Sequence, residues 1–158
     1  MKILITTILL FLAQTAFAIS VCFTPSPLCG CLIVESIQAA HKSILVQAYV
    51  FTSKPIQKAL LDAKKRGVAV KLILDKTESN NPFIASSHID TWIDDTPRIA
   101  HNKIMLIDDK LIITGSYNFS KSASKNAENV LFIANDDALY EGYLRNWFYR
   151  QSVSKKVG

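Results

Sequence analysis

Four polar side chains recur at alternate positions near the middle of the chain. His101 and Lys103 lie on one apolar run, and Ser116 and Asn118 follow a second one. Alternate side chains of a strand share a face. Asp109-Lys110 is placed to be the two-residue loop of a hairpin, so Lys103 should face Ser116. By the same count, His101 faces Asn118. A nucleophile, a cation and two hydrogen-bonding groups would then meet in one patch, which suits a phosphate.

A strand–helix–strand pattern precedes this patch and predicts the framework that positions it. Residues 44–51 (ILVQAYVF) are almost continuously apolar, which is typical of a strand buried on both faces. Ser53 is a suitable N-cap for a helix that stops at Gly67, with basic residues in its last turn where the helix dipole favours them. Residues 68–74 form a second apolar strand. These lengths predict a βαβ unit with parallel neighbours.

The remaining segments predict one α/β domain. Residues 32–42 have helical spacing, 130–134 have strand character, and 136–150 carry an apolar helical stripe that we interpret as core. Residues 76–97 are turn-rich, can hold a short helix within 83–92 and lead into the hairpin, so we expect them to overhang the site. The predicted fold is a mixed, largely parallel β-sheet flanked by helices on both faces.

Written as a pattern, the central stretch is His101-x-Lys103-x4-Asp108, then Gly115-Ser116-x-Asn118, with Glu128-Asn129 further on. This pattern resembles the HKD motif of the phospholipase D superfamily. The resemblance covers nearly all of the chain after residue 18 and is greatest to the small, single-motif, exported bacterial endonucleases of that superfamily. It implies a phospholipase D-like fold and phosphodiesterase activity. Three other segments share it: Phe23-Thr24-Pro25, AYVFT at 48–52 and AKKRGV at 63–68.

Each polar residue of the patch has a physical role in such a reaction. A neutral imidazole attacks phosphorus at neutral pH, so His101 is the candidate nucleophile and would form a covalent phosphohistidine. Lys103 would place a positive charge against the non-bridging oxygens. Asn118 and Ser116 can donate hydrogen bonds to the same oxygens. Ordinary turn chemistry after Gly115 explains Ser116 equally well.

Glu128 matches the acidic residue that orients the nucleophilic His in nucleases of this family. A carboxylate on the imidazole Nδ1–H fixes the tautomer and stabilises the imidazolium. Glu128 follows Asn118 sooner than in the nearest relatives, so we expect a tight loop over 120–127. Asp108 and Gly115 belong to the motif, but the hairpin count puts Asp108 on the face opposite His101. We assign both a structural role.

One motif supplies only half of the reaction. A phosphohistidine mechanism needs a second group that protonates the leaving oxygen and later activates water. The sequence holds no second H-x-K, because Lys42 follows His41 directly. In the family the second His comes from another copy of the motif, so the resemblance implies a homodimer with a shared active site. No carboxylate cluster indicates a divalent metal, and we expect no cofactor.

Residues 1–18 have the features of a secretory signal peptide. Lys2 precedes an apolar run over 3–12, and Ala16-Phe17-Ala18 is an A-x-A cleavage sequence. The alternative, a membrane anchor, needs about 20 apolar residues. We therefore predict cleavage after Ala18, a mature domain over 19–158 without a membrane span, and a secreted or periplasmic location.

Export would permit a disulfide among the three cysteines. Cys22 can pair with either Cys29 or Cys31, and the remaining thiol would be free or would cross-link two chains. A zinc site is the rival interpretation, but no second cysteine pair or His cluster completes the ligand set.

The charge favours anionic partners, with a formal value of +5, or +4 (5 − 1) without Lys2. Our leading hypothesis is a secreted, metal-independent phosphodiesterase that cleaves DNA or RNA non-specifically, because a phosphate-only site reads no bases. The runner-up is a phospholipase D that hydrolyses phospholipid headgroups with the same residues. A third hypothesis is a non-catalytic nucleic-acid-binding module. The basic candidates for the nucleic-acid backbone are Lys54, Lys58, Lys64, Lys65, Arg66 and Lys71.

Overall fold

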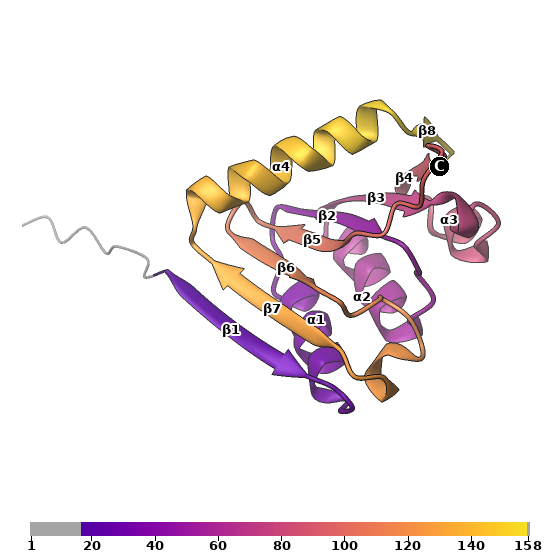
Figure 1. Cartoon of the computed structure of the whole chain (residues 1–158). Helices are drawn as coiled ribbons and strands as arrows, with labels where there is room; N and C mark the ends of the chain where they lie inside the picture. Colours follow the sequence, from indigo (N-terminus) through magenta and orange to yellow (C-terminus); the bar gives the residue numbers. More distant parts are fainter. Residues whose placement is uncertain (1–16, 158) are drawn as a thin grey trace, which may run out of the picture.

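An eight-stranded mixed sheet runs through the computed structural model, which describes residues 17–157 (Figure 1). The strand order is β1-β7-β6-β5-β2-β3-β4-β8. The predicted signal peptide, residues 1–18, lies outside the described residues except for Phe17 and Ala18. The strands are β1 (Ala18–Phe23), β2 (Ser43–Ala48), β3 (Ala69–Asp75), β4 (Asp90–Asp94), β5 (Lys103–Ile107), β6 (Leu111–Gly115), β7 (Asn129–Ala134) and β8 (Lys155–Lys156).

The βαβ unit expected from the sequence lies in the middle of the sheet. α2 (Lys54–Lys65) connects the parallel neighbours β2 and β3 and buries Ile56 and Leu60 against them. Gly67, at φ +92°, follows the helix in a conformation that favours glycine. β3 and β4 are also parallel, whereas the other neighbouring pairs are antiparallel. The α/β class and the mixed sheet are confirmed. The expectation that the sheet is largely parallel is wrong, because only β2–β3 and β3–β4 are parallel pairs.

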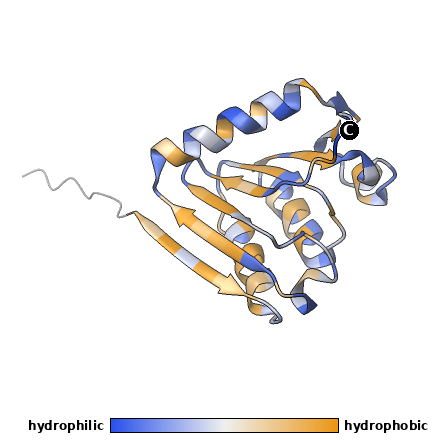
Figure 2. Cartoon of the chain, in the orientation of Figure 1, coloured by the Kyte–Doolittle hydropathy of each residue, from blue (hydrophilic) through white to orange (hydrophobic). Residues whose placement is uncertain are grey.

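Helices cover both faces of the sheet, as expected. α1 (Leu28–Gln38) and α2 pack on one face, and α4 (Asp137–Ser152) crosses the other (Figure 1). Trp147 of α4 is fully buried, and its Nε1–H donates to Val46 O at 3.2 Å. Figure 2 shows largely hydrophobic strands beneath an α4 of mixed hydropathy, which is typical of a helix that covers a core with one face.

The described part of the chain shows two further features. No helix between residues 17 and 157 is long and apolar enough to cross a membrane. Cys22 of β1 pairs with Cys29 of α1, which is one of the two expected pairings, and Cys31 is a free, exposed thiol.

The segment 76–97 differs from the sequence interpretation. η1 (Lys76–Glu78) and α3 (Pro82–Ser87) are short, so the helix expected within 83–92 ends early and residues 90–94 join the sheet as β4. His88 ends α3 in the left-handed region at φ 51°. The end of β4 is held by buried Asp94, which accepts from Arg150 Nε of α4 at 2.8 Å. This tertiary pairing has no local sequence signal.

The register of the β5–β6 hairpin corrects the sequence-based count by one residue. Ile107 pairs with Leu111 and Ile104 with Thr114, so the predicted pairs of Lys103 with Ser116 and of His101 with Asn118 are wrong. The loop has three residues, 108–110, instead of the two-residue Asp109-Lys110 loop. His101 and Asn118 both lie beyond the ends of β5 and β6, so the pairing of these strands does not set their relative positions.

Asp108 leaves the ladder because its carboxylate binds the backbone at the start of β2. It accepts hydrogen bonds from His41 N (2.8 Å), Lys42 N (2.7 Å) and Ser43 N (3.0 Å). Burial acts to raise the pKa of Asp108, but these three N–H groups outweigh it and hold the pKa below its ordinary value of 3.8. The structural role expected for Asp108 thus has a physical basis at the start of the neighbouring strand β2.

Asp108→Asn should lower the free energy of unfolding by about 2 kcal/mol at pH 7, because the charged acceptor is lost and an amide N–H meets the backbone donors. Asn tolerates the φ of 54° at this position, so the change isolates the charge. The folded-state pKa of Asp108 is lowered, so its stabilisation is full above about pH 5 and is lost as the pH falls through the folded-state pKa.

Urea unfolding at pH 7 and pH 3 measures this difference, which should shrink at pH 3. Asp109→Asn is the matched control, since Asp109 has a φ of 60° in the same turn and is exposed. It should change stability by less than about 0.5 kcal/mol. Equal effects of the two variants at pH 7 would contradict the role assigned to Asp108.

Candidate active site

Three strand ends meet at one edge of the sheet and carry the expected site residues. Lys103 begins β5 and pairs with Ala48 at the carboxyl end of β2. The loop after β6 is bound to the chain just beyond β2, because Phe119 O accepts hydrogen bonds from Thr52 N (3.0 Å) and Ser53 N (2.9 Å). Backbone pairing around β2 therefore brings the two halves of the motif together.

A buried carboxylate fixes the chain just before His101. Asp75 Oδ2 accepts from Ala100 N at 2.7 Å, and its Oδ1 accepts from Thr77 N at 3.0 Å. Burial acts to raise the pKa of Asp75, but hydrogen bonds from Thr77 and Ala100 outweigh it, so the pKa lies below 3.8. Asp75 is a positioning residue that the sequence interpretation missed. Its place at the carboxyl end of a buried strand was the available signal.

His101 and Lys103 contact each other directly. Lys103 Nζ lies 2.9 Å from His101 Nδ1 and donates to His101 O at 2.6 Å. The imidazole is exposed, whereas Lys103 is buried. Because Nδ1 faces Lys103, Nε2 is the ring nitrogen left to face a substrate.

Lys103 loses its positive charge more readily than an exposed lysine does, because its side chain is buried. Burial lowers the pKa of the ammonium group below 10.5, and the Glu128 carboxylate acts in the opposite direction. Glu128 therefore lies close enough to interact electrostatically with Lys103. The sequence interpretation assigned Glu128 to His101, whereas this electrostatic interaction is with Lys103.

Tyr49 is a second site residue that the sequence interpretation did not single out. Its ring centroid lies 4.6 Å from that of His101, with the rings tilted by 52°, and Lys103 Nζ lies 5.3 Å from the same centroid. Tyr49 directly follows β2, beside the Ala48–Lys103 pair. Its signal was the aromatic position at the end of a buried strand. The ring limits the positions that both His101 and Lys103 can adopt.

Asn118 presents an amide without an internal partner at its oxygen. Among the described residues, Asn118 Oδ1 is buried and has no hydrogen-bond donor. Rotation of the amide by 180° would present Nδ2 at the same point, since the two ends have nearly the same shape. A buried, unpaired amide end is costly in a core and is typical of a group that awaits a ligand.

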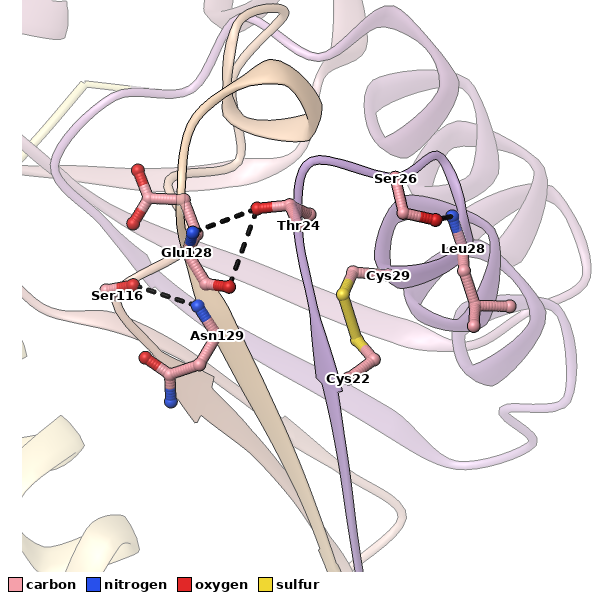
Figure 3. The surroundings of a disulfide bond; sticks show 8 residues. All are labelled: Cys22, Thr24, Ser26, Leu28, Cys29, Ser116, Glu128 and Asn129. Carbon is pink, nitrogen blue, oxygen red and sulfur yellow. Dashed lines mark hydrogen bonds between the residues drawn. A yellow bond between two sulfur atoms is a disulfide. The ribbon is translucent and has the colours of Figure 1, made fainter.

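Ser116 contacts the backbone of β7. Its Oγ accepts from Asn129 N at 3.1 Å, and its own N–H donates to Asn129 O at 3.1 Å (Figure 3). Tyr117 N also approaches Asn129 O, at 3.4 Å, so two residues oppose one in a bulge. Gly115 permits it, because its φ is +149° and a Cβ there would collide with Asn129 O. The turn-related interpretation of Ser116 accounts for these contacts, and its O–H proton is left to donate.

Glu128 does not contact His101 among the described hydrogen bonds. Its Oε1 accepts from Asn126 Nδ2 at 3.2 Å, within the loop 120–127 that the sequence predicted to be tight. Its backbone is bound by Thr24, whose Oγ1 accepts from Glu128 N at 3.0 Å (Figure 3). The contact expected between this carboxylate and the imidazole is not made in this structure, where the carboxylate binds Asn126.

A pocket of about 500 Å³ lies beside His101 and Lys103. Its other walls are the end of β6 at Thr114 and Gly115, and the side of α4 at Tyr143 and Asn146. Residues 76–97, which the sequence interpretation placed over the site, do not line it. Within residues 17–157, no group of three or more His, Cys, Asp or Glu side chains could hold a metal ion.

Comparisons with known proteins identify the relatives of this chain. Residues 33–150 match a family model described as "Cardiolipin synthase, PLD-like domain". The chain is 45% identical over 145 residues to a phospholipase D of Rickettsia prowazekii, covering 88% of this chain and 70% of the relative. It is 27% identical over 111 residues to the mitochondrial cardiolipin hydrolase of Homo sapiens, covering 66% of this chain and 44% of the relative.

Solved structures show the same fold. Nuc of Salmonella typhimurium, a phospholipase D family member, superimposes with a TM-score of 0.84 at 34% identity, covering 90% of this chain and 99% of Nuc. NucT of Helicobacter pylori superimposes with a TM-score of 0.79 at 22% identity, covering 90% of this chain and 100% of NucT. With the family model, the Rickettsia relative and Nuc in agreement, the chain belongs to the phospholipase D superfamily of phosphodiesterases.

Proposed function

We propose that this chain is an exported, metal-independent endonuclease that cleaves DNA or RNA without sequence preference through a phosphohistidine on His101. The observation that carries the proposal is the exposed imidazole of His101, held against the buried Lys103 ammonium and the ring of Tyr49. This arrangement offers a nucleophile and a positive charge to one phosphate, and a contact to a phosphate carries no sequence information.

The reaction needs the His101 tautomer that carries its proton on Nδ1. In this structure Lys103 occupies Nδ1. A phosphate in the site offers oxygens to Lys103, and Nδ1–H can then donate to Glu128. Nε2 attacks phosphorus, a P–N bond forms, and the P–O bond to the leaving group breaks. Water later attacks phosphorus and breaks the P–N bond, which frees the imidazole.

The other site residues stabilise charge on the phosphate. Lys103 binds the non-bridging oxygens as negative charge grows in the transition state. Asn118 supplies its unpaired amide end, and Ser116 supplies the O–H proton that its contact with Asn129 leaves available. The hydrogen bonds from Asn118 and Ser116 would go to a charged phosphate, and such bonds are stronger than those between neutral groups.

A second copy of the chain completes the chemistry in this proposal. The leaving oxygen needs a proton, and the attacking water must lose one. The other histidines of the chain, His41 and His88, are exposed and lie outside the motif. A twofold homodimer that shares one active site supplies the group as the partner's His101.

The positions of the basic side chains support a nucleic-acid substrate but change the residues involved. Lys58 and Lys65 pair with Asp62, and Arg66 binds the carbonyls at the end of α1. These expected candidates are engaged in the fold. Exposed cations on the loops that carry the site are better placed to bind a phosphate backbone: Arg98, Lys121 and Lys125.

A phospholipid headgroup is the second candidate substrate. The Rickettsia relatives are called phospholipase D. β1 also exposes large apolar side chains at alternate positions, which could contact acyl chains: Ile19, Val21 and Phe23. The catalytic residues would be the same for either substrate.

Two features support export of the protein: the apolar run near the start of the sequence and the disulfide. The Cys22–Cys29 bond joins β1 to α1. Structural disulfides persist in oxidising compartments, which supports a secreted or periplasmic location.

His101→Asn should abolish cleavage of plasmid DNA and RNA, with a loss of at least about a thousandfold, because no other group replaces the nucleophile. Wild-type protein should stay active in EDTA. Gel assays on both nucleic acids, with phosphatidylcholine hydrolysis in parallel, measure this. His88→Asn is the matched control, since His88 is exposed and adopts a left-handed conformation that Asn tolerates. If the folded protein cuts none of these substrates, the proposed enzymatic activity is wrong. Cleavage of lipid alone would favour the phospholipid as the substrate.

Mixed dimers should lose activity out of proportion to the variant added. If each site needs two copies of His101, an equimolar, randomly reassorted mixture of wild type and His101→Asn retains about one quarter of wild-type activity, against about one half for independent sites. Denaturing and refolding the mixture, followed by kinetic assay, distinguishes these values. A mixture of wild type with His88→Asn should retain full activity. Retention of about one half would contradict the shared site.

Tyr49→Ala should lower kcat about tenfold, because His101 and Lys103 lose the ring that limits their positions. Tyr49→Phe keeps the ring and should stay near wild-type activity. Steady-state kinetics on a chromogenic phosphodiester measure both. Tyr149→Ala, which removes an exposed ring from α4, is the control and should have no effect. An unaltered Tyr49→Ala enzyme would remove Tyr49 from the site.

A further inference from the structure

The short loop between β1 and α1 lies against Glu128, the residue that directly precedes β7. Figure 3 shows Thr24 between Glu128 and the Cys22–Cys29 disulfide. Thr24 N donates to Glu128 O at 3.0 Å, and Thr24 Oγ1 accepts from Glu128 N at 3.0 Å. Both backbone polar groups of Glu128 are therefore bound by one residue that lies 104 positions earlier in the chain.

The disulfide closes this loop on both sides of Thr24. Cys22 is paired with Val130 in the sheet, and Cys29 is fully buried in the first turn of α1. Ser26 N also donates to Ser124 O at 3.0 Å, so the closed loop contacts the 120–128 segment at two points. A loop with both ends fixed has fewer conformations, and its contacts keep their geometry.

The two sides of the Glu128–Asn129 backbone are bound by different elements. Thr24 holds Glu128 from the β1 side, and Ser116 holds Asn129 from the β6 side. Fixing the backbone at these two residues fixes the direction of the Glu128 Cα–Cβ bond. The position of the carboxylate then depends on its own side-chain torsions and on the hydrogen bond from Asn126 Nδ2 at 3.2 Å. From this position the carboxylate raises the pKa of Lys103.

We propose that Thr24 is a positioning residue for the Glu128 carboxylate, and that the disulfide-closed loop 22–29 holds Thr24 in place for this task. The activity part of the inference rests on the proposed function, since Glu128 acts there on His101. The positioning part does not, because it concerns where the carboxylate lies.

Thr24→Val tests the inference, because valine has the shape of threonine and lacks the oxygen that Glu128 N needs. With bis(p-nitrophenyl) phosphate as the substrate, kcat should fall about tenfold with KM unchanged. The pKa of Lys103, followed by NMR of 13C-labelled lysine, should also fall, because the carboxylate that raises it moves away. Glu128→Gln gives the full size of that fall.

Three further variants define the cause. Thr24→Ser keeps the oxygen and should restore kcat and the Lys103 pKa to wild-type values. Ser26→Ala is the matched control in the same loop, where the Ser26 side chain binds only Leu28 N. Cys22→Ala/Cys29→Ala opens the loop and should lower kcat and the Lys103 pKa as Thr24→Val does. If Thr24→Val does not fold, Thr24→Ala removes the same oxygen.

The outcomes separate this inference from the proposed function. A Lys103 pKa that is unchanged in Thr24→Val overturns the role of Thr24, whatever the activity. An unchanged pKa in the double cysteine variant overturns the role of the disulfide. If wild-type protein cleaves no phosphodiester, the proposed function fails, while the Lys103 pKa still decides whether Thr24 positions Glu128.

Discussion

Backbone pairing around the carboxyl end of β2 is the constraint on which the site depends. β2 is buried on both faces and lies between a parallel and an antiparallel neighbour. Its end meets Lys103 of β5, and the residues that follow bind Phe119 after β6. Main-chain hydrogen bonds in a buried sheet tolerate little displacement, so side chains from distant segments meet there with fixed geometry. The chemistry then needs only the right side chains at these backbone positions.

Much of the framework could be predicted from patterns that depend on local physics. The apolar run at 44–51, the N-cap at Ser53 and the basic last turn before Gly67 each reflect the chemistry of one element, and they identified the βαβ unit. The motif identified His101 and Lys103, and the structure places them in direct contact. These elements could be predicted because their local sequence preferences agree with the fold.

The rest depended on tertiary contacts that leave no local trace. The hairpin register shifted because Asp108 binds backbone groups more than sixty residues earlier in the chain. β4 ends at Asp94, which binds Arg150 of α4. Two basic side chains of the α2 region, Lys58 and Arg66, are bound by Asp62 and by the end of α1. Tyr49 and Asp75 act through neighbours in space, so only the folded chain shows what they touch.

The pairing of β1 with β7 has a consequence for the order in which the molecule forms. The first described strand must wait for residues 129–134, so these contacts have high sequence separation and close late during folding. A chain that has emerged only as far as His101 lacks Lys103, Asn118 and Glu128, and also the strand that pairs with β1. The candidate site therefore assembles only when almost the whole described length is available.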